Sequence, residues 1–155
     1  MKINFHSSVI FVKDMEASKD FYCNILQQEM EYDFGNNISL KNGLSIWQVP
    51  SEHSLNKSFY RKDNTNQALE LYFETEDIDS AVKLIEKGNI KKHHELIEET
   101  WGQKTIRVYD PDHNLIEIGE KLEVFIRRMH YNGLSIHQIN QKTGVPVETI
   151  KKMIE

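Results

Sequence analysis

Cysteine is almost absent from this 155-residue sequence: Cys23 stands alone, so no disulfide can form within one chain. A sequence without disulfides is typical of a reducing compartment, and we expect a cytoplasmic protein. Apolar runs of about 18 residues, which a membrane-spanning helix needs, are also missing. The first residues lead directly into an alternating apolar pattern and lack the layout of a signal peptide. We therefore expect no membrane partner.

Positive charge is scarce as well. The chain has 19 Lys and Arg against 24 Asp and Glu, a formal net charge of −5, which argues against a protein that coats nucleic acid. The imbalance lies in residues 1–119, with 13 basic against 20 acidic side chains, whereas residues 120–155 carry 6 against 4. The length suits one domain with a small appendage, long enough to bury roughly two thirds of the unfolded surface.

Two stretches of the chain repeat one order of elements. Residues 5–12 alternate in polarity and predict a strand, and Asp14 is placed to cap a helix that ends near Leu26. Three short strands follow, at 30–34, 38–41 and 44–49. Residues 50–67 are polar and aperiodic, which predicts a long loop. The second copy consists of a strand at 68–75, a helix over 77–87, and strands at 93–97, 104–109 and 114–119.

The helix starts confirm the repeat within the sequence: Val12–Ala17 (VKDMEA) matches Thr75–Ser80 (TEDIDS). Two copies of roughly 60 residues indicate an internal duplication. Each sheet would carry its helix on one face and would need another partner for the second face. The predicted class is therefore α+β. It has two β-α-β-β-β modules with mixed sheets, at about 3–50 and 67–119 of a domain 1–119, and a helical tail at 120–155.

The last hairpin of the domain carries the most informative pattern. Thr105–Tyr109 is β-branched and aromatic, Leu115–Ile118 alternates, and Asp110–Asn114 (DPDHN) between them is turn chemistry. Glu117 stands in an otherwise apolar strand. Because a buried, unpaired carboxylate is costly, Glu117 must face solvent, a partner or a ligand.

This hairpin, with Trp101-Gly102 before it, and the segment Phe11–Tyr22 resemble the glyoxalase/bleomycin resistance protein/extradiol dioxygenase (vicinal oxygen chelate) superfamily. The resemblance covers about residues 3–119. It implies that the inward faces of the two sheets form a cupped cavity, which often holds one divalent metal (Ni, Zn, Fe or Mn) with up to four protein ligands. It also implies a homodimer.

Counted from landmarks shared with the superfamily, the four ligand positions fall on Ser7, Trp47, Glu70 and Glu117. Only the two glutamates are competent ligands, and catalytic sites typically use three or more. His6 is the nearest further candidate, but a one-residue offset turns a strand side chain to the other face unless a bulge intervenes. Three uses of the glutamates stay open. They could bind a metal completed by water or His6, they could act in proton transfer or recognise a cationic or polar ligand, or they could pair with Lys or Arg, for example Arg107, without chemistry.

Aromatic side chains are expected around these carboxylates, namely Phe11, Trp47, Tyr72 and Tyr109. Together with Ser7 and Arg107 they complete the candidate ligand-binding residues. An acidic, aromatic cavity suits a planar or cationic organic molecule through stacking and cation–π contact. This resembles the antibiotic-sequestering branch of the superfamily, which binds its ligand without metal or chemistry.

The tail predicts three helices, at 120–131, 134–142 and 147–154, with Ser135 as a cap and Pro146 at a helix start. Residues 135–154 look like a helix-turn-helix with Gly144 in the turn. The pattern departs at Asn140, where a small residue is usual, and the low positive charge disfavours phosphate contact. We prefer a helical appendage that packs on the sheets, covers the cavity or mediates dimerisation.

Three functions follow from these features. The leading one is a small-molecule-binding protein with a planar or cationic organic ligand. The second is a metal-dependent lyase, isomerase or dioxygenase of the same fold, with Glu70 and Glu117 as catalytic residues and metal ligands. The third is a ligand-sensing regulator whose tail binds DNA.

Overall fold

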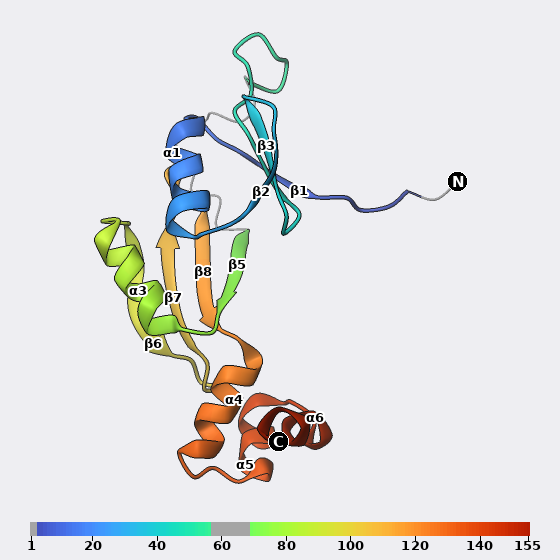
Figure 1. The fold of residues 1–155 in the computed structure, drawn as a ribbon, viewed down its shortest axis with the longest axis vertical. Helices are drawn as coiled ribbons and strands as arrows, with labels where there is room; N and C mark the ends of the chain where they lie inside the picture. The colour runs from blue at the N-terminus through green and yellow to red at the C-terminus, as the bar shows by residue number, and fades with distance from the viewer. Residues whose placement is uncertain (1–2, 57–68) are drawn as a thin grey trace. The chain divides into compact units, whose positions relative to one another are not determined.

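The chain folds into two compact units, each built on one four-stranded sheet. The computed structural model describes residues 3–56 and 69–155, so most of the predicted loop at 50–67 lies outside the described residues. One unit holds the described residues up to 56 together with Asp110–Asn114. The other unit holds Leu69–Tyr109 and Leu115–Glu155 (Figure 1).

The first unit has the predicted β-α-β-β-β order. Its elements are β1 (Ser8–Phe11), α1 (Met15–Lys19), the π-helical segment η1 (Asp20–Ile25), β2 (Met30–Asp33), β3 (Asn37–Leu40) and β4 (Leu44–Trp47). The strand order is β1-β4-β3-β2, with β1 parallel to β4 and the other pairs antiparallel. The prediction of a mixed sheet is confirmed.

The helix of this unit begins where the sequence predicts but changes its geometry half-way. The Asp14 carboxylate accepts the backbone N–H groups of Glu16 and Ala17, both at 3.0 Å, as an N-cap does. From Asp20 onward the segment is π-helical, and the Leu26 N–H bonds to the Phe21 carbonyl at 2.9 Å. Sequence periodicity alone does not reveal this change.

The turn Asp110–Asn114 packs into the first unit although its flanking strands belong to the second. The buried Tyr22 hydroxyl donates to Asp110 Oδ2 at 2.8 Å, and the Asp112 carboxylate accepts the Lys13 N–H at 3.1 Å. Asp110 also accepts the backbone N–H groups of Asp112 and Asn114, at 2.9 and 2.8 Å. The predicted turn residues therefore bind both their own backbone and the helix of the first module.

The second unit repeats the architecture. Its sheet elements are β5 (Glu70–Thr75), α3 (Ile78–Lys87), β6 (Lys92–Glu98), β7 (Lys104–Tyr109) and β8 (Leu115–Glu120). The strand order is β5-β8-β7-β6, with β5 parallel to β8. Asp77 caps α3 by accepting the Ser80 N–H at 2.9 Å. The apolar face of the sheet, which includes Ile106 and Ile116, is buried on the side that α3 covers (Figure 1).

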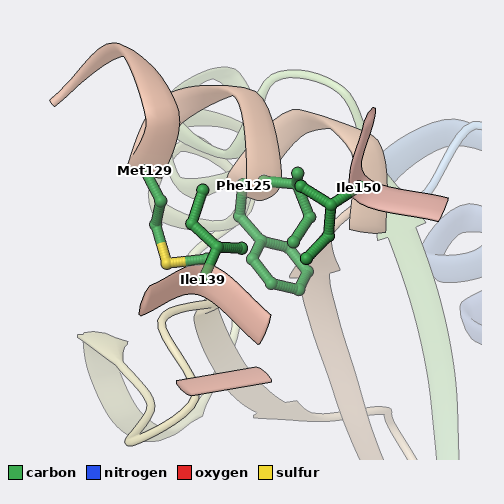
Figure 2. Packing of buried hydrophobic residues seen from close by; sticks show 5 residues of the cluster. Phe125, Met129, Ile139 and Ile150 are labelled. Atoms are coloured by element: carbon green, nitrogen blue, oxygen red, sulfur yellow. The ribbon is translucent and has the colours of Figure 1, made fainter. Parts of the chain in front are cut away.

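The tail forms the three predicted helices, α4 (Leu122–Tyr131), α5 (Ile136–Thr143) and α6 (Val147–Ile154), gathered beyond the end of β8 (Figure 1). Ser135 and Gln138 form a capping box at the start of α5, and Gly144 ends it with a left-handed φ of 74°. Figure 2 shows the small core that joins the helices; its buried members are Phe125, Ile126, Met129, Ile139 and Ile150.

Arg128 of α4 joins the tail to the second sheet. Its guanidinium donates to Glu120 Oε1 at 3.0 Å and to Oε2 at 2.8 Å. It also donates to the Gly102 carbonyl at 2.6 Å and to Glu98 Oε2 at 3.1 Å. The predicted packing of the tail on a sheet is therefore present within this unit. Across residues 3–56 and 69–155, no helix has the length and apolar character needed to cross a membrane.

Candidate functional site

The predicted carboxylates lie on one side of the second sheet, here called the polar face and defined by Glu70, Tyr72, Arg107 and Glu117. Alternation along β5 separates Glu70 and Tyr72 from Leu71, and the sheet pairing places Tyr72 opposite Glu117 and Glu117 opposite Arg107. Directly opposed residues point to the same side of a sheet. Glu70, Tyr72, Arg107 and Glu117 therefore lie on the same side of the second sheet.

Arg107 is the centre of the polar face, because its guanidinium contacts three carboxylates. Its Nε donates to Glu70 Oε2 at 2.7 Å, and its Nη1 donates to Glu99 Oε1 at 2.9 Å. Its Nη2 forms an ion pair with Glu117, whose side chain is only 7% exposed. One positive charge against three negative charges leaves this cluster at −2.

The electrostatics of the cluster favour the charged forms of Arg107 and Glu99. Burial lowers the pKa of Arg107, but its hydrogen bonds to Glu99 and Glu70 outweigh burial and raise it overall. The hydrogen bond from Arg107 lowers the pKa of Glu99. His94 Nε2 lies 3.3 Å from Arg107 Nη1 and extends the cluster along β6.

The donor set of the polar face does not fit a divalent metal. The guanidinium stands between Glu70 and Glu117, where a metal bound by both would have to lie. Within the described ranges, no three His, Cys, Asp or Glu side chains are grouped so as to hold a metal ion. His6, the third metal candidate, is an exposed residue before β1 in the other unit. The arrangement is an ion-pair cluster suited to polar recognition.

Tyr109 stands at the β6 side of the second sheet. Its hydroxyl lies 2.8 Å from His93 Nδ1, and Lys91 Nζ lies 5.3 Å from the centre of its ring. These contacts place a predicted ligand-binding aromatic beside an imidazole ring and an ammonium group.

The candidates of the first module share one face of the first sheet. The Phe11 and Trp47 rings lie 5.8 Å apart between centroids, and the Trp47 ring lies 5.2 Å from that of His53. The sheet pairing sets Val9 opposite Ser45 and Phe11 opposite Trp47. Ser7 is half-buried just before β1. This face is aromatic and neutral, in contrast to the acidic polar face of the second sheet.

Counting back from each helix-capping Asp changes which residue of β4 corresponds to Glu117. In the second module, Glu117 pairs with Tyr72, which lies five residues before Asp77. In the first module, the residue five before Asp14 is Val9, and Val9 pairs with Ser45. Ser45 therefore corresponds to Glu117. The sequence overlay gives Trp47 for that position. Neither Ser45 nor Trp47 is a carboxylate, so the first module offers no acidic counterpart to Glu117.

The first unit also holds a cleft of about 410 Å³ that the sequence did not suggest. Its lining is mainly polar and includes Lys13, Asn36, Gln48, Ser51 and Asn56. None of the predicted ligand-binding residues lines it. Sequence reasoning missed it because the lining residues come from turns and strand ends, where no periodic pattern singles them out.

Two residues of the second unit were also missed. Glu99 and Gln103 lie in the connection between β6 and β7, yet Glu99 binds Arg107 and Gln103 donates to the Tyr72 hydroxyl at 2.7 Å. The Trp101-Gly102-Gln103 string was recognised as part of a hairpin. It carried no sign that the glutamine side chain turns back onto the sheet.

A comparison with protein families identifies the fold. The model of the glyoxalase-like domain matches residues 5–123, most of the chain. The chain belongs to the glyoxalase-like domain family. A search among curated proteins finds no match.

Solved structures agree with this membership. A protein of unknown function from Agrobacterium tumefaciens C58 is 32% identical, with a TM-score of 0.66, over 79% of this chain and 97% of that one. A glyoxalase/bleomycin resistance protein/dioxygenase from Alicyclobacillus acidocaldarius is 18% identical, with a TM-score of 0.57, over 77% and 92%. A lactoylglutathione lyase from Agrobacterium tumefaciens is 21% identical, with a TM-score of 0.57, over 78% and 96%. The last two likenesses show the fold alone.

Within this family, most of the tail lies beyond the matched segment, which ends at residue 123. Helices α5 and α6 are therefore additions to the glyoxalase-like domain. The predicted α+β duplicated fold with a C-terminal helical extension is confirmed.

Proposed function

We propose that this glyoxalase-like chain is a small-molecule-binding protein that recognises a planar or cationic organic ligand without a resident metal. One observation carries the proposal: Arg107 already satisfies the carboxylates that a metal would need. The net charge of −2 on the cluster supports a cationic or hydrogen-bond-donating ligand over an anionic one. Tyr72, on the same face and 48% exposed, supplies aromatic surface.

Glu70 and Glu117 have different parts in this proposal. Glu117 is buried and fixed by its ion pair, so it holds Arg107 in place. Glu70 is more exposed, with a side chain 33% accessible, and has oxygen lone pairs left for a ligand. Ser7, Phe11 and Trp47 stay predictions for ligand binding, as do the homodimer and the cytoplasmic location.

The other two functions receive less support. A metal-dependent lyase or dioxygenase needs a donor set that the described residues do not offer. The DNA-binding regulator finds no support in the family match or in the solved structures named above. On the last helix, Lys151 is paired with Glu148 at 2.7 Å, which reduces the charge available for phosphate.

The proposal is tested by ligand screening on chelator-treated protein. Planar organic cations should raise the thermal midpoint. At a ligand concentration one hundred times Kd, the free energy of unfolding should rise by about 2.7 kcal/mol. Binding should weaken in Glu70→Gln and stay unchanged in the control Glu95→Gln, which removes the same charge from a Lys92 ion pair elsewhere on the sheet. A ligand that binds only after a divalent metal is restored, or equal affinity in both variants, would overturn the proposal.

A further inference from the structure

A second pocket lies within the second unit, where the tail meets the sheet. Its volume is about 320 Å³, within the range of small-ligand sites. The sheet and its connection contribute Tyr72, Glu74, Trp101 and Gln103 to the lining, and the tail contributes apolar side chains such as Phe125 and Val145. This junction pocket shares Tyr72 with the polar face, but its lining contains none of the charged residues of the Arg107 cluster, and it goes beyond the proposed function.

The wall that the tail supplies is an addition to the glyoxalase-like domain. The family model ends at residue 123, before Phe125 and Val145. Three of the eight residues that line the junction pocket, Phe125, Thr143 and Val145, lie beyond the matched segment, so the matched domain alone does not form this pocket.

A chain of hydrogen bonds holds the polar side of the junction pocket in one arrangement. Trp101 Nε1 donates to Gln103 Oε1 at 3.0 Å, and Gln103 Nε2 donates to the Tyr72 hydroxyl at 2.7 Å. The same Nε2 donates to the Glu120 carbonyl at 2.8 Å, and Gln103 is only 7% exposed. The Tyr72 hydroxyl donates in turn to Glu74 Oε1 at 3.1 Å. Two aromatic side chains and a carboxylate are thus ordered before any ligand arrives, which lowers the entropic cost of binding.

Gly119 makes this arrangement feasible. A Cβ at that position would lie 2.7 Å from Gln103 Nε2 and 3.1 Å from Tyr72 Cε2. A larger residue would displace both side chains from their shared hydrogen bond. The backbone of β8 therefore approaches the network as closely as a glycine allows.

The chemistry of the lining selects one class of ligand. Tyr72 and Trp101 are 48% and 38% exposed, so both offer ring surface that solvent can reach. Glu74 is exposed and forms no ion pair within 4.0 Å among the residues that the structure describes. The lining contains no Lys or Arg, which disfavours an anion. Aromatic rings, apolar walls and one carboxylate together suit a positively charged, alkyl-substituted nitrogen.

We propose that the junction pocket binds a small organic ammonium ion, with the cation against Tyr72 and Trp101 and its charge balanced by Glu74. The apolar tail residues contact the alkyl groups of the ligand. The ligand would also bridge the tail and the sheet, so binding should stabilise the attachment of α4–α6.

Isothermal titration with choline and with its neutral isostere 3,3-dimethyl-1-butanol tests the proposal on the full chain. Choline should bind once per chain and roughly tenfold more tightly than the isostere, because the two share shape and differ in charge. Glu74→Gln and Trp101→Leu should each weaken choline binding by roughly tenfold. Trp101→Phe, which keeps a ring, should retain most of it. The control Glu95→Gln removes the same charge from a Lys92 ion pair on β6, outside the lining, and should bind as the wild type does.

Folding of each variant is checked by circular dichroism, and Trp101→Phe keeps the test valid if Trp101→Leu unfolds. Three results would overturn the proposal: no choline binding at millimolar concentration, equal affinity for the neutral isostere, or binding that Glu74→Gln leaves unchanged. Choline binding that is lost in Glu70→Gln but kept in Glu74→Gln would place the ligand on the polar face. That result would refute ligand binding in the junction pocket and would be consistent with the proposed function at the polar face.

Discussion

Replacing Arg128 should separate the tail from the sheet at a measurable cost. The guanidinium makes both of its shortest carboxylate contacts with Glu120, whose side chain is 3% exposed. In Arg128→Met the apolar stem remains but Glu120 is left as a buried charge. Removing one partner of a buried ion pair typically costs 3–5 kcal/mol. Glu120 keeps its hydrogen bond from the Lys104 N–H at 2.8 Å, so we expect about 3 kcal/mol.

The neighbouring residue supplies a matched control. Arg127 lies on the same helix and pairs with Glu123 at 2.6 Å, but the two side chains are 58% and 51% exposed. An exposed pair contributes about 0.2–1 kcal/mol, and the hydrogen bond from Arg127 Nε to the Met153 carbonyl adds about 1 kcal/mol, so Arg127→Met should cost less than Arg128→Met. The double variant Arg128→Met/Glu120→Gln removes the buried charge as well and should recover part of the loss.

Urea unfolding followed by circular dichroism and by tryptophan fluorescence measures both effects. Trp101 lines the junction pocket, so its emission should report loss of the tail contact. For a chain of this length, 3 kcal/mol corresponds to a fall in Tm of about 6–12 °C. If Arg128→Met loses no more stability than Arg127→Met, the reasoning about the buried Glu120 charge is wrong.

Three further predictions concern single positions. Gly102→Ala should cost about 2–3 kcal/mol in thermal denaturation, because φ is 96° and the new Cβ would lie 2.6 Å from Met129 Sδ. Gly133→Ala, with a φ of 94° and open space, should cost only about 1 kcal/mol; equal losses would contradict the close contact. The hydrogen bond from Arg107 lowers the pKa of Glu99 below its ordinary 4.5, so its stabilisation is complete above that pH and is lost as the pH falls through the lowered pKa. The urea midpoint of the wild type should therefore drop more steeply in acid than that of Glu99→Gln, and parallel curves would refute the pairing. Arg107→Ala leaves three carboxylates without their cation, so its Tm should lie well below that of the wild type and should partly recover in Arg107→Lys; equal Tm values for the wild type and Arg107→Ala would contradict the shared-cation geometry.

Much of the fold could be predicted because local patterns and tertiary structure agree. The strand at 104–109 and the helix at 147–154 have the predicted bounds, since β-branched residues, proline and periodicity all mark their ends. The helix from Asp14 was expected as one piece. Its second half is π-helical and buries Phe21 and Tyr22, and residue spacing does not reveal that change of hydrogen bonding.

The sequence predicted which side of the sheet the candidate residues lie on, but it did not predict which side chains they contact. Spacing from the capping Asp77 placed Glu70 on one side of β5, and the hairpin placed Glu117 beside it. The contact of Arg107 with both glutamates was one of three open alternatives. Its third partner, Glu99, lies in a connection that has no period, so only the folded chain brings it to the guanidinium.

Packing of the tail on the sheets was one expectation from the sequence, but the contact that makes it was not predicted, for a related reason. Glu120 was expected to begin a helix, but it ends β8 with its side chain buried against Arg128. A charged residue at the end of a helix or strand is expected to be solvent-exposed unless a buried partner is known. The residue pattern therefore predicted the helices of the tail. It did not predict the contact between Arg128 and Glu120 that orients these helices within the second unit.

The turn at Asp110–Asn114 has a consequence for how the protein emerges from the ribosome. Tyr22 receives its partner Asp110 only after 88 further residues have been added. At ordinary translation speeds this takes roughly 4–18 seconds. During that interval the nascent amino-terminal module lacks the turn Asp110–Asn114, which packs into it. The module can therefore complete its folding only after most of the second module has been synthesised.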